Sequence, residues 1–254
     1  MLLITEILSA MFITNIERLP RKKNRIYIDD EYAFMLYDRD LTAYGLDRCI
    51  VSDSQDTFET DMDIPDRLFE KIMKETVLRR AHQKAVALLE RMDRSETELR
   101  RRLKLDMYSE SVTDETIAWL KSRHFLDDAR FAESYIRGHI ESSSRQELTS
   151  RLLAKGVPKE VINSAYDACC EELSFSPADG SPTYSGSTDP AAGNAEKLAA
   201  VKTLRKKLGS GKNLTPKERM NVIGYMLRKG FRRNDIMSAF DELEIVIGYD
   251  DIPE

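Results

Sequence analysis

The sequence predicts a mainly α protein of tandem three-helix repeats in an elongated arc, preceded by a small N-terminal extension that contains a β-hairpin. Two observations predict the helical part. An apolar pattern that ends at Lys155-Gly156 returns 74 residues later at Lys229-Gly230, and three Ser/Thr-x-x-Glu capping boxes open three equivalent helices. A repeated helical unit buries its apolar face only by stacking on its neighbours, so an extended array is expected.

The first element is the extension, residues 1–64, whose composition differs from that of the rest of the chain. Ile26-Tyr27-Ile28 and Tyr32-Ala33-Phe34 are β-branched and aromatic runs on either side of Asp29-Asp30, a pattern typical of a tight hairpin. A third strand is expected at 12–16, a short helix at 40–46 and a further strand within 51–63. So small a unit lacks a core of its own, and we expect it to dock on the helices that follow.

Helical spacing of apolar residues begins at Ile64-Pro65 and continues to residue 244. The first repeat, with the helix that leads into it, occupies 65–125, with helices at 79–93, 95–105 and 113–123. The second occupies 126–173, with helices at 127–142, 144–155 and 158–173. The third occupies 195–244, with helices at 195–208, 215–229 and 232–244. Residues 174–194 are rich in Ser, Pro, Gly, Thr and Ala, which predicts a flexible linker that lets the third repeat move. Residues 245–254 form an acidic tail.

The helix boundaries rest on local chemistry. Ser95 with Glu98, Ser144 with Glu147, and Thr215 with Glu218 each have the spacing in which a hydroxyl and a carboxylate satisfy free N–H groups reciprocally. Asp127 is expected to cap the helix that opens the second repeat. Gly156 and Gly230 are expected to end helices, because glycine adopts a positive φ without steric cost.

Several function classes find no support in the residues. The three cysteines are odd in number and two are adjacent, so no disulfide framework is predicted and a reducing cytosol is expected. No segment approaches the roughly 18 consecutive apolar residues of a membrane span. The three histidines are scattered, and no phosphate-binding glycine loop or nucleophile motif occurs. We therefore predict no catalytic residue, no metal and no cofactor, and we expect Trp119 and Phe125 to belong to the core.

Charge is strongly segregated along the chain. The net charge is −5, yet residues 79–104 carry a balance of +5 and residues 196–240 a balance of +9. The stretches 1–78, 105–195 and 241–254 are acidic, at −6, −7 and −6. Lys and Arg also fill solvated helix faces with no further role. The two basic segments are nevertheless where a polyanion or an acidic protein surface would bind.

The predicted binding residues are therefore cations on these helices and around the glycine turns. Guanidinium groups hold carboxylates or phosphates in bidentate fashion, which suits both an acidic protein groove and a nucleic-acid backbone. The candidate partner-binding residues are Arg94, Arg100, Arg101, Arg102, Arg145, Arg151, Lys155, Lys202, Arg205, Lys206, Arg228, Lys229, Arg232 and Arg233.

These motifs together resemble the RecX family, regulators of the RecA recombinase. The first repeat reads Arg94-Ser95-Glu96 with Glu98-Leu99-Arg100, and the second reads Phe125-Leu126-Asp127-Asp128-Ala129-Arg130-Phe131-Ala132, followed by the turn Leu152–Val157. The turn Leu227–Phe231 matches the third. The resemblance covers 65–244. The chain departs from the family where Ser144-Arg145 replaces Gly-Pro, where no Lys-Gly follows Leu103, and in the long 174–194 insertion.

The resemblance implies a non-enzymatic, cytoplasmic and monomeric protein that binds in the groove of the RecA filament. Single-stranded DNA within or beside the filament is a further contact, and no membrane is involved. Such a protein is expected to inhibit recombination, RecA ATP hydrolysis and the SOS damage response. The alternative is a helical-repeat nucleic-acid-binding protein that acts independently of RecA. An enzyme is a third reading, which no residue pattern supports.

Overall fold

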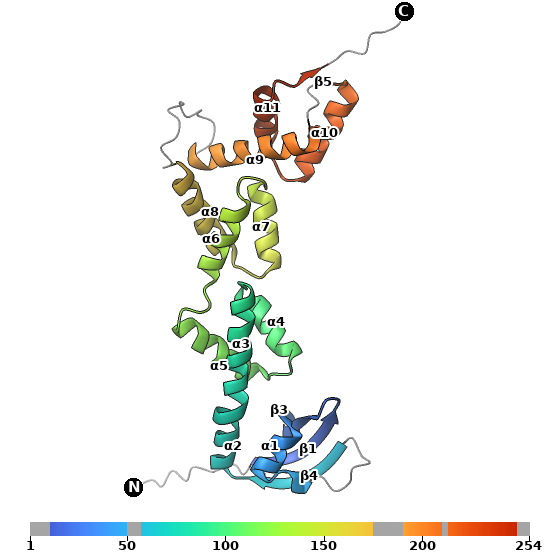
Figure 1. Cartoon of the computed structure of the whole chain (residues 1–254), viewed down its shortest axis with the longest axis vertical. Helices are drawn as coiled ribbons and strands as arrows, with labels where there is room; N and C mark the ends of the chain where they lie inside the picture. The colour runs from blue at the N-terminus through green and yellow to red at the C-terminus, as the bar shows by residue number, and fades with distance from the viewer. Residues whose placement is uncertain (1–10, 50–56, 175–189, 210–212, 248–254) are drawn as a thin grey trace, which may run out of the picture. The chain divides into compact units, whose positions relative to one another are not determined.

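The computed structural model describes residues 11–49, 57–174, 190–209 and 213–247. The chain divides into two compact units, Met1–Leu126 and Asp127–Glu254. The predicted fold class, mainly α with a small N-terminal β-containing extension, is confirmed (Figure 1). Among the described residues, no helix has the length and apolar character needed to cross a membrane.

The extension is a four-stranded antiparallel sheet. Its strands are β1 (Met11–Leu19), β2 (Lys23–Ile28), β3 (Glu31–Tyr37) and β4 (Thr57–Ile64), in the order β3-β2-β1-β4. The predicted hairpin turns at Asp29 and Asp30, whose φ angles of 49° and 66° suit aspartate better than most residues. The hairpin and the third strand are confirmed. Helix α1 (Asp38–Tyr44) and a 3₁₀ helix (Asp47–Cys49) follow β3.

The sheet docks on a continuous helix formed by α2 (Asp66–Ile72), a π-helical segment (Met73–Leu78) and α3 (Arg79–Arg91). Ile13, Ile16 and Phe34 of the sheet share one core with Ile72 and Val77 of this helix. The extension therefore obtains the core that its own size cannot supply, as the sequence predicts.

The first repeat continues with α4 (Glu96–Leu105) and α5 (Glu110–Ser122). Ala85, Leu99, Leu103, Ile117 and Leu120 form its buried core. The predicted capping box before α4 is complete, because the Glu98 N–H donates to the Ser95 hydroxyl and the Ser95 N–H donates to the Glu98 carboxylate.

The second unit contains the second and third repeats. Its helices are α6 (Asp128–His139), α7 (Arg145–Ala154), α8 (Lys159–Ser174), α9 (Pro190–Leu208), α10 (Pro216–Arg228) and α11 (Arg233–Glu242). Asp127 caps α6 as predicted, and Thr215 with Glu218 forms a complete box before α10. Gly156 and Gly230 have φ angles of 81° and 87°, which confirms both helix ends.

Three features of the second unit differ from the sequence analysis. Ser144 caps α7, but Glu147 does not return a hydrogen bond to the Ser144 N–H, so the predicted box is half formed. Most of the predicted linker, 175–189, lies outside the described residues, and its last five residues belong to α9. A short parallel ladder of β5 (Asn213–Leu214) with β6 (Val246–Ile247) was not predicted; residues 248–254 of the predicted tail lie outside the described residues.

The second and third repeats pack against each other within this unit. Ala195 of α9 is buried in the core of the second repeat, together with Leu148, Ile162 and Cys169. The third repeat therefore contacts the second in this structure, and the flexibility of the linker at 174–194 stays a prediction. The linker composition gave no sign of these contacts, because they join residues far apart in the sequence.

Candidate partner-binding surface

The structure separates the predicted cations into two groups. One group is held by carboxylates or aromatic rings of its own unit and serves packing. It comprises Arg100, Arg145, Arg151, Lys155, Lys202 and Lys229. The other group remains available to a partner.

Arg100 is an example of a cation that joins two helices of its own repeat. Its Nε donates to a Glu96 oxygen at 2.7 Å one turn away on α4, and its Nη1 donates to Asp114 on α5. It therefore ties two helices of the first repeat together. Arg151 pairs with Glu147 at 2.7 Å along α7, an i,i+4 contact worth a few tenths of a kcal/mol.

Arg145 closes the second repeat on itself. Its guanidinium lies 3.1 Å from an Asp167 oxygen on α8 and 4.5 Å from the ring centroid of Tyr166, which is buried. Lys155 similarly lies over the rings of Phe131 and Tyr135, at 5.8 and 5.9 Å. Both cations contribute to packing more than to recognition.

The predicted Lys-Gly turn of the third repeat is a packing contact, which we call the repeat joint (Ser144, Gln146 and Glu147 of the second repeat with Lys229 and Gly230 of the third). The Ser144 hydroxyl accepts from the Glu147 N–H at 3.1 Å and donates to the Lys229 carbonyl at 2.6 Å. The Lys229 ammonium donates to Glu147 at 2.8 Å. One buried hydroxyl therefore satisfies the amino end of α7 and the carboxyl end of α10 together.

Gly230 allows this close approach. A Cβ at this position would lie 2.8 Å from Gln146 Cβ and 2.9 Å from the Ser144 hydroxyl. Outside the joint, Lys202 on α9 pairs with Glu141, and Thr203 donates to the Ser142 carbonyl. The third repeat is thus seated on the loop that precedes α7.

Two carboxyl groups lie beside the joint. The Arg145 N–H donates to Glu196 at 2.7 Å, so Glu196 of α9 caps a helix of the other repeat. Burial, with the nearby Asp235 carboxyl, raises the pKa of Glu196 above its usual 4.5, and burial also raises the pKa of Asp235. The folded state therefore binds protons more strongly than the unfolded chain at this pair.

We expect Glu196→Gln to raise the free energy of unfolding at pH 7. A raised pKa in the folded state means that stability is lost as the pH rises through that pKa, and the neutral amide removes this loss while its oxygen still accepts from Arg145. Urea unfolding at pH 7 and pH 4 measures the effect. The gain should shrink at pH 4, where Glu196 is protonated, and a variant that is less stable at pH 7 would contradict it.

The available cations lie mainly on the third repeat. Their side chains are exposed and form no hydrogen bond or ion pair with the described residues; they are Arg205 and Lys206 on α9, Arg228 on α10 and Arg233 on α11, with Arg101 and Arg102 on α4 of the first repeat. Arg232 is also exposed, but it stabilises the charged forms of Glu196 and Asp235. Arg94 is half-buried, and its Nε has no hydrogen-bond partner.

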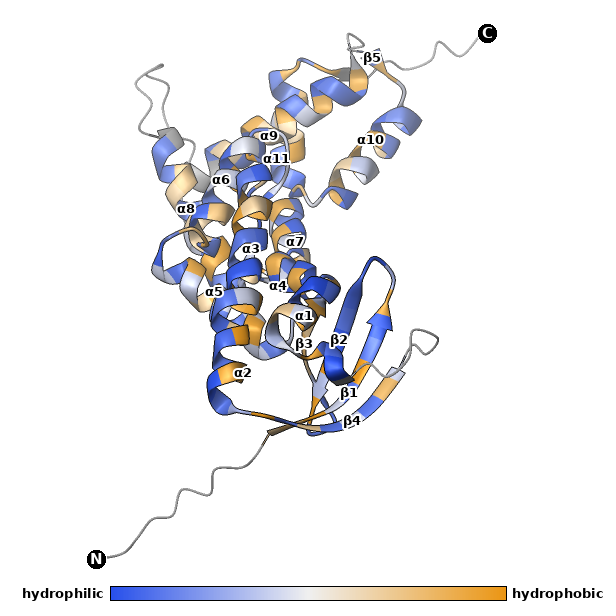
Figure 2. Ribbon diagram, turned by 60° about the horizontal axis from the view of Figure 1, so that its bottom comes forward, coloured by the Kyte–Doolittle hydropathy of each residue, from blue (hydrophilic) through white to orange (hydrophobic). Residues whose placement is uncertain are grey.

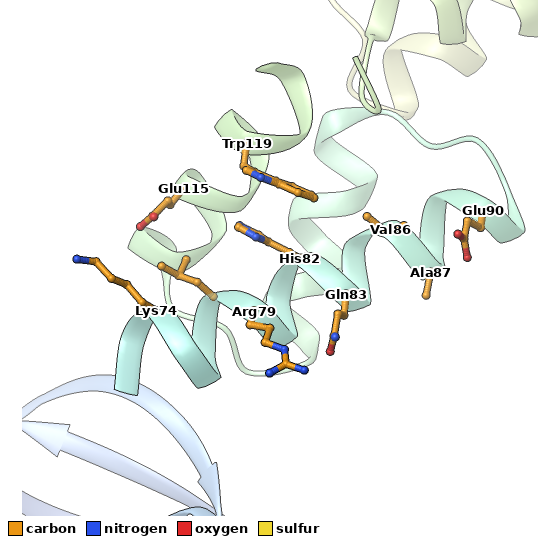
Figure 3. A pocket seen from close by; sticks show the side chains of 10 residues that line it. Lys74, Arg79, His82, Gln83, Val86, Ala87, Glu90, Glu115 and Trp119 are labelled. Carbon is orange, nitrogen blue, oxygen red and sulfur yellow. The ribbon is translucent and has the colours of Figure 1, made fainter. Parts of the chain in front are cut away.

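The structure also shows an apolar groove between α3 and α5 that the sequence analysis missed (Figure 3). Its volume is about 680 Å³, and the stacked rings of His82 and Trp119, with centroids 4.1 Å apart, form one wall. Burial lowers the pKa of His82, so this ring is neutral at pH 7. Lys74 and Arg79 balance the two glutamates at its rim, Glu90 and Glu115.

The expectation that both aromatic residues near α5 belong to the core is partly wrong. Trp119 is half-buried and lines the groove, whereas Phe125 is 48% exposed. Within the described ranges, no group of three or more His, Cys, Asp or Glu residues is arranged to hold a metal ion.

Two family models match this chain, one in the first repeat and one in the second. The family model described as RecX, first three-helix domain, matches residues 81–120, and that described as RecX, second three-helix domain, matches residues 127–165. A solved chain described as the crystal structure of regulatory protein RecX has a TM-score of 0.50 at 18% identity, over 91% of this chain and 99% of that one. At that identity the likeness supports the fold.

Curated relatives carry the name regulatory protein RecX. The protein from Clostridium acetobutylicum is 28% identical over 153 residues, which are 59% of this chain and 66% of that protein, just short of two thirds of its length. The relative from Yersinia enterocolitica is 26% identical over 63% of this chain and 95% of its own. The relative from Bacillus licheniformis is 27% identical over 92% of this chain and 78% of its own.

Proposed function

The chain belongs to the RecX family, and on that premise we propose that it binds the RecA recombinase filament and inhibits recombination, ATP hydrolysis and the SOS response. In this proposal the protein is a cytoplasmic monomer that catalyses no reaction. It would favour one state of the filament by binding that state more tightly.

The observation that carries this proposal is the set of available cations on the third repeat. Arg205, Arg228 and Arg233 come from three different helices of one compact unit, and each is exposed without a carboxylate partner among the described residues. Charges left unpaired within a folded unit are free to contact an acidic partner surface or a phosphate backbone. The tandem repeats would let successive modules contact successive filament subunits, and we propose the division at 65–125, 126–173 and 195–244 as that modular organisation.

The test is co-sedimentation of the full chain with RecA filaments assembled on single-stranded DNA, together with RecA ATP hydrolysis. Arg228→Glu with Arg233→Glu should weaken filament binding at least about tenfold, because like charges placed against an acidic surface cost several kcal/mol. The matched control, Arg91→Glu with Lys159→Glu, makes the same charge change at exposed residues outside the third repeat. Equal binding by the two double variants would contradict the proposed surface.

A conservative double substitution distinguishes a partner with a shaped protein groove from a partner that is only a polyanion. Arg228→Lys with Arg233→Lys keeps both charges but loses the bidentate fork, so filament binding should weaken if the partner is RecA. The second candidate, a nucleic-acid-binding protein independent of RecA, predicts little effect of this change. It also predicts binding to bare single strands that falls with salt by about 0.7 logarithmic units per neutralised phosphate, and no effect on RecA filaments.

A further inference from the structure

A second basic surface lies in the N-terminal unit, partly on residues 1–78, whose net charge is −6, and partly on α3. We call it the basic cleft, a hollow of about 740 Å³ whose cations are Arg21 and Lys22 of the β1–β2 turn, Arg39 of α1, and Arg80 and Lys84 of α3. Its volume is within the range of ligand pockets, roughly 300–1,000 Å³. The β1–β2 turn forms a hydrophilic tip (Figure 2).

The acidic groups near the cleft neutralise only some of these charges. Arg80 holds Asp40 through two hydrogen bonds, at 2.6 and 2.8 Å, and Lys84 pairs with Asp106 at 3.0 Å. Asp38 accepts from the Asn24 amide. Five cations face these three carboxylates, so the cleft keeps a surplus of two positive charges.

The surplus resides in the turn. Arg21 and Lys22 are exposed and form no hydrogen bond or ion pair from their side chains to the described residues. Arg39 lies 3.8 Å from an Asp40 oxygen that Arg80 already holds. Arg21 and Lys22 can therefore accept a new anionic partner with no ion pair to break among the described residues.

Aromatic rings lie among these cations. The Tyr37 ring has the guanidinium of Arg80 at 5.1 Å and that of Arg39 at 5.8 Å from its centroid, and Tyr108 lines the same cleft. Grooves that combine cations with aromatic rings are typical of single-strand binding, in which the backbone follows the charges and bases stack on rings or guanidinium planes.

The backbone of the turn gives an independent argument. Arg21 and Lys22 have φ angles of 67° and 59°, a left-handed conformation that costs most L-residues about 1–2 kcal/mol and that Asn or Gly adopts more readily. The neighbouring hairpin uses aspartates at its equivalent strained positions, Asp29 and Asp30. Strained residues that persist where better residues exist are concentrated at functional sites.

From this geometry we infer that the basic cleft binds the phosphodiester backbone of single-stranded nucleic acid, with Arg21 and Lys22 on phosphates and Tyr37 beside the bases. This site is separate from the cations of the third repeat. It does not depend on the proposed action on RecA.

The test uses the full chain and a fluorescein-labelled oligothymidylate, without RecA, followed by fluorescence anisotropy at several salt concentrations. Arg21→Asn with Lys22→Asn should weaken binding several-fold at low salt. The dependence of log affinity on log salt should become shallower by about 1.4, since two phosphate contacts of about 0.7 each are lost. The Tm of this double variant should equal or exceed that of the wild type, because asparagine adopts the left-handed conformation more readily than arginine or lysine.

The control Arg67→Gln with Lys71→Gln removes the same two charges from exposed positions on α2, outside the cleft. The measurements are repeated in the Arg228→Glu, Arg233→Glu background, where the effect of the turn should persist if the sites are separate. Affinity and salt slope equal to those of the control would overturn the inference.

Two further experiments identify the class of ligand that the basic cleft binds. Photocrosslinking to a strand that carries 5-iodouracil should label the peptide that contains Tyr37 or Tyr108, and labelling confined to the third repeat would overturn the assignment. Inorganic phosphate at matched ionic strength, or polyglutamate at matched charge, should compete poorly. Equal competition by polyglutamate would assign the cleft to acidic protein segments instead.

Discussion

Gly230→Ala is expected to destabilise the second unit by roughly 2–5 kcal/mol. About 1–2 kcal/mol comes from holding an alanine at a φ of 87°, in the left-handed region. A Cβ only 2.8 Å from Gln146 Cβ and 2.9 Å from the Ser144 hydroxyl adds an overpacking cost of roughly 1–3 kcal/mol. Urea unfolding of the full chain, followed by far-UV circular dichroism, measures the total.

Gly209→Ala is the matched control. Gly209 also has a positive φ, 63°, but apart from its own chain neighbours and helix backbone no atom of the described residues lies within 4 Å of the position its Cβ would occupy. Its cost should therefore be the conformational part alone, about 1–2 kcal/mol. If the two variants lose the same stability, the close approach of Gly230 to Gln146 and Ser144 contributes nothing to the stability of the second unit.

The second large effect is expected from Asp40→Ala in the N-terminal unit. Asp40 is 7% exposed, it binds both terminal nitrogens of Arg80, and it accepts from the Tyr37 N–H at the start of α1. Removing one partner of a buried pair costs about 3–5 kcal/mol, because the remaining charge is left desolvated. Arg80 retains some contact with solvent, with 25% of its side chain exposed, which favours the lower end.

The pH dependence identifies the cause of this loss. Burial alone would raise the pKa of Asp40, but the hydrogen bonds from Arg80 and from the Tyr37 N–H lower it below its usual 3.8. A lowered pKa stabilises the fold above the unfolded value and ceases to do so as the pH falls through the folded value. The difference between wild type and Asp40→Ala should thus be largest near pH 7 and shrink below about pH 4.

The control for this variant is Asp63→Ala, on an exposed position of β4. Surface substitutions of this kind usually change stability by less than about 0.5 kcal/mol. A pH-independent loss at Asp40 would mean that packing, rather than the ion pair, is responsible.

The features that the sequence predicted correctly are those encoded within a few consecutive residues. The Thr215 and Glu218 capping box, the Asp29-Asp30 turn and the left-handed Gly156 each depend on chemistry within one turn of chain. Such signals do not depend on tertiary contacts. Most helix ends therefore lie within three residues of their predicted positions.

The partners of charged side chains were not predictable in the same way. Glu147 has the spacing of a capping box, yet it pairs with Lys229 on another repeat, 82 residues away. Arg145 likewise turns to Asp167 and Tyr166. Charge counts along the chain mark where cations are plentiful, but only the fold decides which of them are neutralised. The basic cleft escaped notice for the same reason, since three of its cations lie in the acidic stretch 1–78 and only the fold brings them beside Arg80 and Lys84 of α3.

The repeat joint determines how far the length of the segment between α8 and α9 can vary. Its hydrogen bonds and ion pair connect α7 and the turn before it to the end of α10, so the second and third repeats are held by contacts that do not involve residues 175–189. The entropy of closing a loop grows only with the logarithm of its length, about 0.6 kcal/mol for each doubling. Insertions between α8 and α9 can therefore accumulate at little energetic cost while the spacing between the second repeat and the cations of α9, α10 and α11 stays fixed.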